Sequence, residues 1–103
     1  MLIVTTETVP GRELETLGLV KGNTIQTVNV LRDIGSGLKT LVGGELKKYT
    51  QMMDGARSIA TARMVEEAQA LGADAVVGLR FMTASIMQSA AEVMAYGTAV
   101  KFR

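Results

Sequence analysis

The alternation of apolar and polar positions predicts strands in the first third of the chain. Leu2 to Thr6 is a short run rich in β-branched residues, and Pro10-Gly11 follows it as a turn signal. Apolar positions then recur from Glu13 to Val30, where Gly18 and Gly22-Asn23 interrupt them. Glycine inside a strand pattern is typical of a bulge or a hairpin turn. This segment therefore predicts either one long bent strand or two short strands.

Two more strands are predicted in the last third, from Ala75 to Ile86 and from Ala90 to Phe102. In the first, Val77, Leu79 and Phe81 alternate with Val76, Arg80, Met82 and Ile86. In the second, Ala91, Val93, Ala95, Gly97 and Ala99 alternate with Glu92, Met94, Tyr96, Thr98 and Val100. In a sheet with one solvated face, each strand has one clearly polar side. Neither of these two strands has such a polar side. The pattern predicts that both faces are covered, in part by another subunit.

Two helices are predicted between these strand regions. The first has an apolar stripe that Gly43-Gly44 ends; its members are Leu31, Ile34, Leu38, Leu41 and Val42. The second, Glu45 to Leu71, has a broader apolar face, and Gly72 is placed as its left-handed C-terminal cap. It would reach roughly 40 Å, whereas a domain of this size has a radius of gyration of about 13 Å. It must therefore bend at Gly55 or extend toward a partner.

The predicted fold class is α+β, in one domain over residues 1–103. An antiparallel or mixed sheet packs on two helices, and the elements follow in the order β-β-α-α-β-β. Hydrophobic residues make up 48% of the chain but aromatic residues only 4%, so the core must be built from small side chains and Met. Small side chains bury little area each, and such a chain often completes its core by association.

Several classes of chemistry are excluded by composition, because the chain contains no His and no Cys. There is no side chain that titrates near neutral pH, no thiolate nucleophile and neither of the commonest ligands of zinc, copper and iron. The charges are nearly balanced, with 11 Lys and Arg against 10 Asp and Glu, and they are scattered. This balance argues against a nucleic-acid partner. Neither a signal peptide nor a membrane-spanning stretch is visible, so we expect a cytoplasmic protein with no membrane partner.

Two groups of residues are candidates for ligand contacts in the absence of any catalytic motif. Methionine sulfur binds soft cations such as Cu(I) or Ag(I), although Met more often fills gaps in a core. We favour packing for most of the Met residues and single out a cluster across subunits around Met82 and Met94. Arg32-Asp33, which precedes the first predicted helix, either caps it with a local ion pair or holds an anion there.

Arg80 and Glu92 are charged positions on otherwise apolar strand faces. If the hairpin centres near Ile86, the two residues lie opposite one another and form a pair. A pair of this kind in a covered face specifies register or a subunit contact more often than it serves catalysis. Arg80 and Glu92 are therefore predicted interface positions.

Several strings of residues resemble one known family over nearly the whole chain. In the first half they are Gly18-Leu19-Val20-Lys21-Gly22-Asn23-Thr24, Asn29-Val30-Leu31-Arg32-Asp33-Ile34, Gly43-Gly44-Glu45 and Tyr49-Thr50. In the second half they are Ala56-Arg57, Gly72-Ala73-Asp74-Ala75-Val76-Val77-Gly78 and Tyr96-Gly97-Thr98-Ala99-Val100. The chain resembles the YbjQ-like family of small bacterial and archaeal proteins.

The resemblance implies an α+β fold and assembly as a ring-like homopentamer. The family carries a heavy-metal-binding label, while its biochemical role is not established. Many relatives have acidic residues on the strand after the Gly-Ala-Asp-Ala segment, whereas this chain has Leu79-Arg80-Phe81-Met82. The replacement of carboxylates by a cation there weakens a cation site.

The preferred function is binding of a metal ion, a small molecule or another protein by a homo-oligomer. The ligand would lie at a subunit boundary or in the interior of the ring, and no specific cofactor is identified. The alternative is a scaffolding homo-oligomer with no ligand. Catalytic activity is disfavoured, because the carboxylate, Lys and Tyr residues have no spacing that is typical of a catalytic site.

Overall fold

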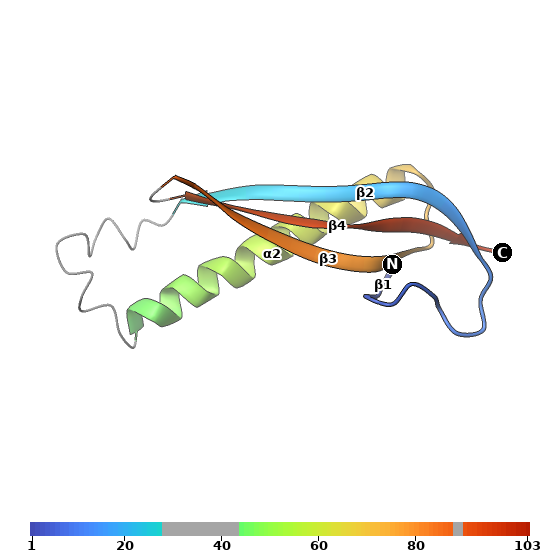
Figure 1. Ribbon diagram of the computed structural model, residues 1–103, viewed down its shortest axis with the longest axis horizontal. Helices are drawn as coiled ribbons and strands as arrows, with labels where there is room; N and C mark the ends of the chain where they lie inside the picture. The colour runs from blue at the N-terminus through green and yellow to red at the C-terminus, as the bar shows by residue number, and fades with distance from the viewer. Residues whose placement is uncertain (28–43, 88–89) are drawn as a thin grey trace.

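The computed structural model describes residues 1–27, 44–87 and 90–103, which form a four-stranded sheet with one helix against it (Figure 1). Along the chain come β1 (Leu2–Ile3), β2 (Leu14–Thr27), α2 (Gly44–Ala70), β3 (Ala75–Met87) and β4 (Ala90–Phe102). The strands lie in the order β1-β3-β4-β2. β1 is parallel to β3, and the other neighbours are antiparallel. The predicted α+β class with a mixed sheet is confirmed.

The predicted arrangement of two helices in the order β-β-α-α-β-β is wrong for the described residues, which follow the order β-β-α-β-β. The stripe from Leu31 to Val42 lies outside the described residues. The second predicted helix is present as α2, of 27 residues. A helix of that length reaches about 40 Å, which matches strands of 13 residues at about 3.4 Å each. One helix is therefore long enough to run along one face of the sheet.

Small side chains form the contact between α2 and the sheet. The helix contributes the buried residues Met53, Ala56, Ala60, Met64 and Ala68. The strands contribute the buried residues Val20, Val76, Val93, Ala95 and Ala99. The predicted small-residue side of β4 is thus the side that faces the helix. Alanine on the helix, and alanine together with Gly22 on the sheet, allow the two backbones to approach closely.

Gly22 is the point of closest approach between β2 and α2. A Cβ atom at this position would overlap the carbonyl oxygen of Ala60 and the amide nitrogen of Met64, and would lie 2.8 Å from the carbonyl carbon of Arg63. Gly22-Asn23 therefore lies in the middle of one continuous strand and forms no turn. The bulge that bends β2 is at Gly18, where φ is 145° and the register with β4 shifts.

α2 also covers the outer edge of β2 with two charged side chains. The Lys21 amide donates a hydrogen bond to the Glu67 carboxylate at 3.2 Å, and the Arg63 guanidinium donates one to the carbonyl of Asn23 at 2.7 Å. β2 is the terminal strand of the described sheet, and such strands expose unpaired backbone groups. The helix thus occupies part of an edge at which another strand would otherwise pair.

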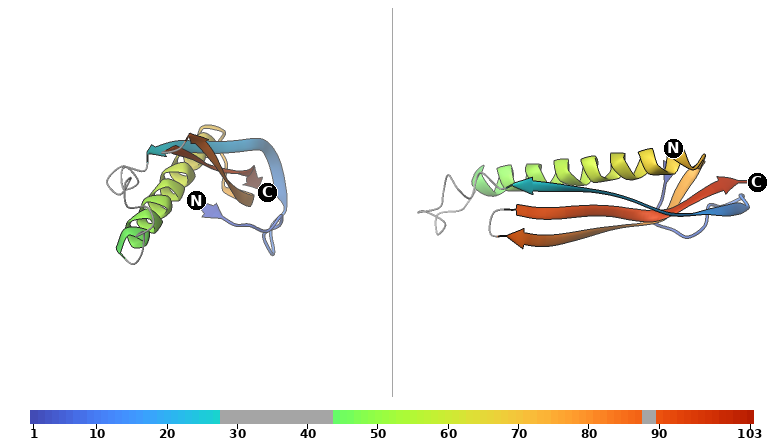
Figure 2. Two further views of the ribbon diagram at one scale, coloured as in Figure 1. Left: turned by 60° about the vertical axis from the view of Figure 1, so that its left-hand side comes forward. Right: turned by 90° about the horizontal axis from the view of Figure 1, so that it is seen from above.

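The two ends of α2 behave differently. At the C-terminal end Gly72 has a φ of 76° and donates to the carbonyl of Gln69, and Ala73 donates to that of Ala68. This is the Schellman pattern, so the predicted cap is confirmed. At the N-terminal end the helix leaves the sheet (Figures 1 and 2). The radius of gyration of 17.1 Å exceeds the value of about 13 Å for a compact domain of this size.

A bulge at Gly78 changes which residues of β3 share a face. Gly78 has a φ of 64°, and the register with β4 shifts between Val77 and Arg80. Val76 and Leu79 therefore pack toward the helix, whereas Val77 and Arg80 lie on the other side. The uninterrupted alternation predicted for this strand is wrong, because the extra residue inverts the side on which each later side chain lies.

The sheet face opposite α2, the outer face, is covered at one end only. The strap, residues 4–13, connects β1 to β2 and places Val4 and Val9 against the buried residues Ala75, Val77 and Val100. Toward the β3–β4 hairpin the outer face has no cover among the described residues, and its large apolar side chains are exposed. The expectation that both faces are covered therefore does not hold within a single chain.

We expect Gly22→Ala to destabilise the fold by about 1–3 kcal/mol, because the new methyl group would overlap the backbone of α2. The control is Gly55→Ala, a helical position with no neighbouring atom within 4 Å. That substitution should stabilise the protein by up to about 1 kcal/mol through helix propensity. Urea unfolding of the three proteins measures both effects. Equal stability of Gly22→Ala and the wild type would contradict the close approach.

Candidate functional site

The exposed part of the outer face consists of rows of three side chains, one from each long strand. Cross-strand register places Lys21, Tyr96 and Arg80 in one row. The next row contains Asn23, Met94 and Met82, and the row after it Ile25, Glu92 and Ala84. The methionine row lies midway between the pair Leu19–Thr98 near the strap and the pair Thr27–Ala90 near the hairpin.

Met82 and Met94 are direct cross-strand partners in this middle row. The structure therefore brings the two residues together within one chain, whereas the cluster across subunits stays a prediction. The exposed fraction of Met82 is 52%, and Met94 is half-buried. Directly opposed Cβ atoms in an antiparallel pair are about 4.5–5.5 Å apart, so the two thioethers are within reach of one another.

Arg80 and Glu92 share the outer face, but their predicted pairing is wrong. Arg80 is opposite Tyr96, whereas Glu92 is opposite Ala84. Four residues of β4 separate the two positions, a distance of about 13 Å. The cause is the hairpin, which pairs Met87 with Ala90 and so is not centred at Ile86. The Arg80 guanidinium instead donates to the carbonyls of Thr5, at 3.1 Å, and Leu79, at 2.8 Å.

Asn23 is the residue of this face that the sequence pattern missed. Its side-chain amide donates a hydrogen bond to the Glu92 carboxylate at 2.9 Å, while its backbone carbonyl accepts from Arg63. It therefore joins the outer face to the helix on the other side of the sheet. Gly22-Asn23 reads as a turn in isolation, and only the pairing with β4 shows that it lies inside a strand.

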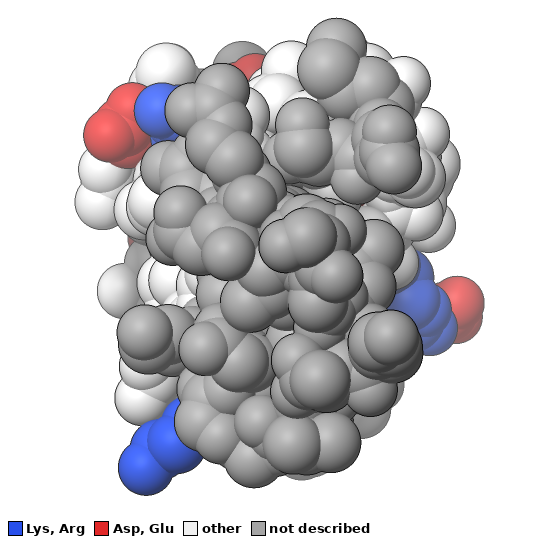
Figure 3. Space-filling model, turned by 90° about the vertical axis from the view of Figure 1, so that its left-hand side faces the viewer, with Lys and Arg blue, Asp and Glu red and all other residues white. Residues whose placement is uncertain are grey.

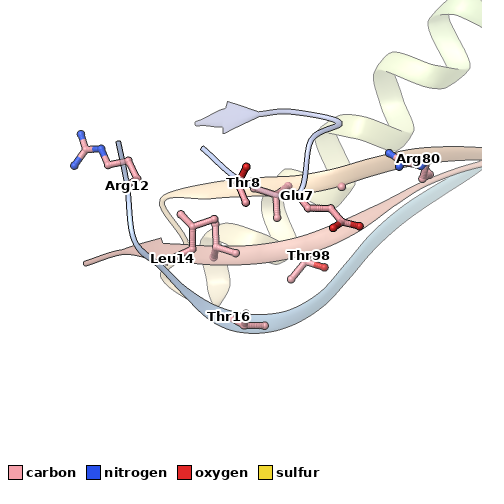
Figure 4. A pocket seen from close by; sticks show the side chains of 10 residues that line it. Glu7, Thr8, Arg12, Leu14, Thr16, Arg80 and Thr98 are labelled. Atoms are coloured by element: carbon pink, nitrogen blue, oxygen red, sulfur yellow. The ribbon is translucent and has the colours of Figure 1, made fainter. Parts of the chain in front are cut away.

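A cavity of about 550 Å³ lies under the strap, beside Arg80 (Figure 4). Leu14, Val77 and Val100 supply apolar lining, and Thr16 and Thr98 supply hydroxyl groups. Figure 4 shows the Glu7 carboxylate near Thr98, whereas the guanidinium of Arg12 points away from the cavity. That guanidinium lies 4.6 Å from the centre of the Phe102 ring. The cavity has the size of a small-molecule site, but its polar groups are exposed and specify no ligand.

The described residues contain no group of three or more carboxylates placed to hold a metal ion. With no His or Cys in the chain, the usual protein cage for zinc is lacking in this part of the molecule. The candidates Arg32 and Asp33 lie outside the described residues. Among the described residues no helix is both long and apolar enough to cross a membrane.

Charge is dispersed over the described surface. Seen from the end drawn in Figure 3, the Lys and Arg atoms of the described residues form separate groups and no continuous basic patch. The ion pairs Arg57–Asp54, Lys101–Asp74 and Arg103–Glu15 are all at exposed positions. Ion pairs at exposed positions add little to the stability of the fold.

The whole chain, residues 1–103, matches the sequence profile of the YbjQ family, which is described as "Putative heavy-metal-binding". The chain belongs to this family. A UPF0145 protein of Clostridium novyi is 63% identical over 101 residues, which is 98% of each chain. One from Fervidobacterium nodosum is 55% identical over 104 residues, which is 100% of this chain and 96% of the relative. The predicted family membership is confirmed.

A solved structure shares the fold of this YbjQ protein at low sequence identity. It is a protein of unknown function from Pediococcus pentosaceus that belongs to the DUF74 family. The TM-score is 0.69 at 18% identity, and the alignment covers 100% of this chain and 98% of the other. At this identity the similarity supports the fold alone.

We expect Arg80→Ala to loosen the strap, because two backbone carbonyls lose their shared guanidinium donor. Amide hydrogens that bond across the strap and β3, those of Val4, Gly78 and Leu79, should exchange faster by roughly fivefold, or about 1 kcal/mol. Hydrogen-exchange NMR measures these rates. Lys21→Ala, in the same row on the opposite strand, should leave them unchanged. Unchanged rates in Arg80→Ala would show that the strap is held without this side chain.

Proposed function

We propose that this YbjQ protein is a binding protein that works as a homo-oligomer. Its subunit boundary is the outer face, and its ligand, a metal ion or a small molecule, lies at that boundary. The observation that carries the proposal is the uncovered apolar surface of the outer face. Leu19, Ile25 and Met82 are 67%, 57% and 52% exposed there. Large apolar side chains that are exposed together on one face are typical of interaction sites.

A second copy of this chain is the partner that best fits the face. Its charges are self-complementary, with Lys21 and Arg80 in the row on one side of the methionines and Glu92 in the row on the other. Packing against another copy also gives the half-apolar sides of β3 and β4 the cover that their sequence pattern requires. The area available, however, restricts the geometry of such an assembly.

The exposed part of the face measures about 30 Å by 14 Å, or roughly 400 Å², from the spacing of strands and residues. A pair of copies packed face to face would bury about 800 Å² of such flat area, whereas a stable interface needs about 1,000 Å² or more. In a ring every chain has two neighbours, one on the outer face and one on a second surface, and the two contacts together bury more area per chain. This argument favours a closed ring, in agreement with the homopentamer that the family resemblance implies.

The free edge of β3 offers a further contact for a neighbouring chain. Beyond Arg80, the residues from Phe81 to Ala84 pair only with β4 among the described residues. Phe81 lies on the helix side there and is 44% exposed, since α2 does not cover the end of β3. Strand pairing at this edge would add backbone hydrogen bonds to the apolar contact.

Binding is proposed here in preference to catalysis. The chain has no His and no Cys, and on the outer face the methionine row separates the row of Lys21, Tyr96 and Arg80 from the row of the single carboxylate, Glu92. A cytoplasmic location stays part of the proposal. The second candidate is a scaffolding homo-oligomer that uses the same face and holds no ligand.

Native mass spectrometry of the protein purified from cells tests the proposal. A pentamer that carries a reproducible extra mass is the expected result, and the mass identifies the ligand class. A bare pentamer would favour the scaffold. A bare monomer at micromolar concentration would overturn the assignment of the outer face as a subunit boundary.

We expect Ile25→Lys to convert the assembly into folded monomers, because a charged group would be buried at the boundary. The matched control is Ile59→Lys, which changes the same residue type at an exposed position of α2, 39% exposed. Size-exclusion chromatography with light scattering gives the mass, and circular dichroism checks the fold. An intact assembly in Ile25→Lys would place the boundary elsewhere.

A further inference from the structure

We infer that Met82 and Met94 form a binding site for a soft monovalent cation such as Cu(I), with two thioether ligands from each chain. The site lies in the middle row of the outer face. The inference rests on the proposed function in one respect, since that function makes the same face a subunit boundary. It adds the ligand class and the two residues that hold the ligand.

Met82 and Met94 lie on the opposite side of the sheet from the methionines that fill the core. Met64 is fully buried and Met53 is 9% exposed, and both belong to the cluster between α2 and the sheet. Packing accounts for them. Met82 is 52% exposed on the opposite side of the sheet, where no described residue covers it. Packing within one chain gives no reason for an exposed thioether at that position.

The register places both sulfur atoms within reach of one ion. The backbones of β3 and β4 hold Met82 and Met94 directly opposite one another. Their Cβ atoms are then about 5 Å apart. Each side chain has three rotatable bonds, so the two thioethers can turn toward a shared cation without any movement of the backbone. The sheet thus supplies the spacing, and the flexible side chains supply the final geometry.

The donor set selects the kind of metal. Thioethers are soft ligands that suit Cu(I), whereas Mg²⁺ and Ca²⁺ prefer carboxylates and carbonyls. The nearby carboxylate, Glu92, already accepts a hydrogen bond from Asn23. Zinc prefers thiolate, imidazole and carboxylate ligands, and the described residues contain no suitable group of them. A soft cation is therefore the form of heavy metal that this face fits.

Assembly would raise the number of donors around the ion. In a cyclic ring the same row of every copy lies at the same height along the symmetry axis. Groups of the neighbouring copy that lie against this row would then add donors to the two-ligand site. The boundary would also exclude water, which otherwise competes with the thioethers for the cation.

Silver ion in chloride-free buffer is the probe, because Ag(I) is soft and does not change its oxidation state in air. The full chain is labelled with ¹³C at the methionine methyl groups, and silver nitrate is added. We expect the resonances of Met82 and Met94 to shift among the seven methionine signals of the chain. Zinc chloride, tested separately, should shift neither.

The double variant Met82→Leu/Met94→Leu should bind Ag(I) at least about tenfold more weakly by isothermal titration calorimetry, equivalent to ~1.4 kcal/mol. Leucine is close to methionine in volume, so the fold should tolerate both changes. The control is Met52→Leu, at a half-buried position on α2, and it should bind silver as the wild type does. Silver binding that survives in the double variant would overturn the site.

The same samples, analysed by native mass spectrometry, separate this inference from the proposed function. An intact oligomer in which silver shifts neither Met82 nor Met94 would overturn the metal site and leave the subunit boundary standing. A monomer in which silver shifts both would support the site and reject the boundary. Shifts confined to other methionines would overturn the site in either case.

Discussion

The close approach of α2 to β2 at Gly22 is the contact on which the rest of the structure depends. No side chain separates the two backbones there, and an added Cβ would overlap the helix. Glu67 and Arg63 then reach the Lys21 amide and the Asn23 carbonyl at the edge of β2. The helix is thereby held over β2 and β4, and its N-terminal end diverges from the sheet (Figure 2). The end of β3 and the part of the opposite face that the strap does not cover are left for other contacts.

The position of α2 on one face of the sheet explains why large apolar side chains of the other face are exposed to solvent. Three strands of 13 or 14 residues have two faces, and one helix covers only one of them. The strap covers a short part of the other face, over Val77 and Val100. The surface that remains combines exposed apolar groups with opposite charges in the two rows on either side of the methionine row. This combination is the reason that we propose another copy of the chain, and not a small ligand alone, as the partner of this surface.

The arrangement of the outer face follows from strand register and not from proximity in sequence. Met82 and Met94 meet because β3 and β4 pair antiparallel around a short hairpin, and the bulge at Gly78 decides that Met82 lies on the outer face. Asn23 connects the same surface to α2 through Glu92 on one side and Arg63 on the other. A disturbance at the helix contact would therefore reach the outer face through β2.

The sequence by itself determined the α+β class, the bounds of the long helix, its cap at Gly72 and the two C-terminal strands, because periodicity and capping are local properties of the chain. It also singled out Arg80 and Glu92, because they are charges on otherwise apolar strand faces, and Met82 and Met94, because thioethers can bind soft cations. Only the tertiary structure decided which of them meet. A bulge of one residue moves every later side chain of the strand to the other face. The hairpin lies a residue or two beyond the predicted position, and Arg80 and Glu92, the predicted charge pair, are therefore about 13 Å apart. The role of Gly22 could likewise be seen only in the fold, because the backbone of α2 occupies the space that a side chain at this position would need.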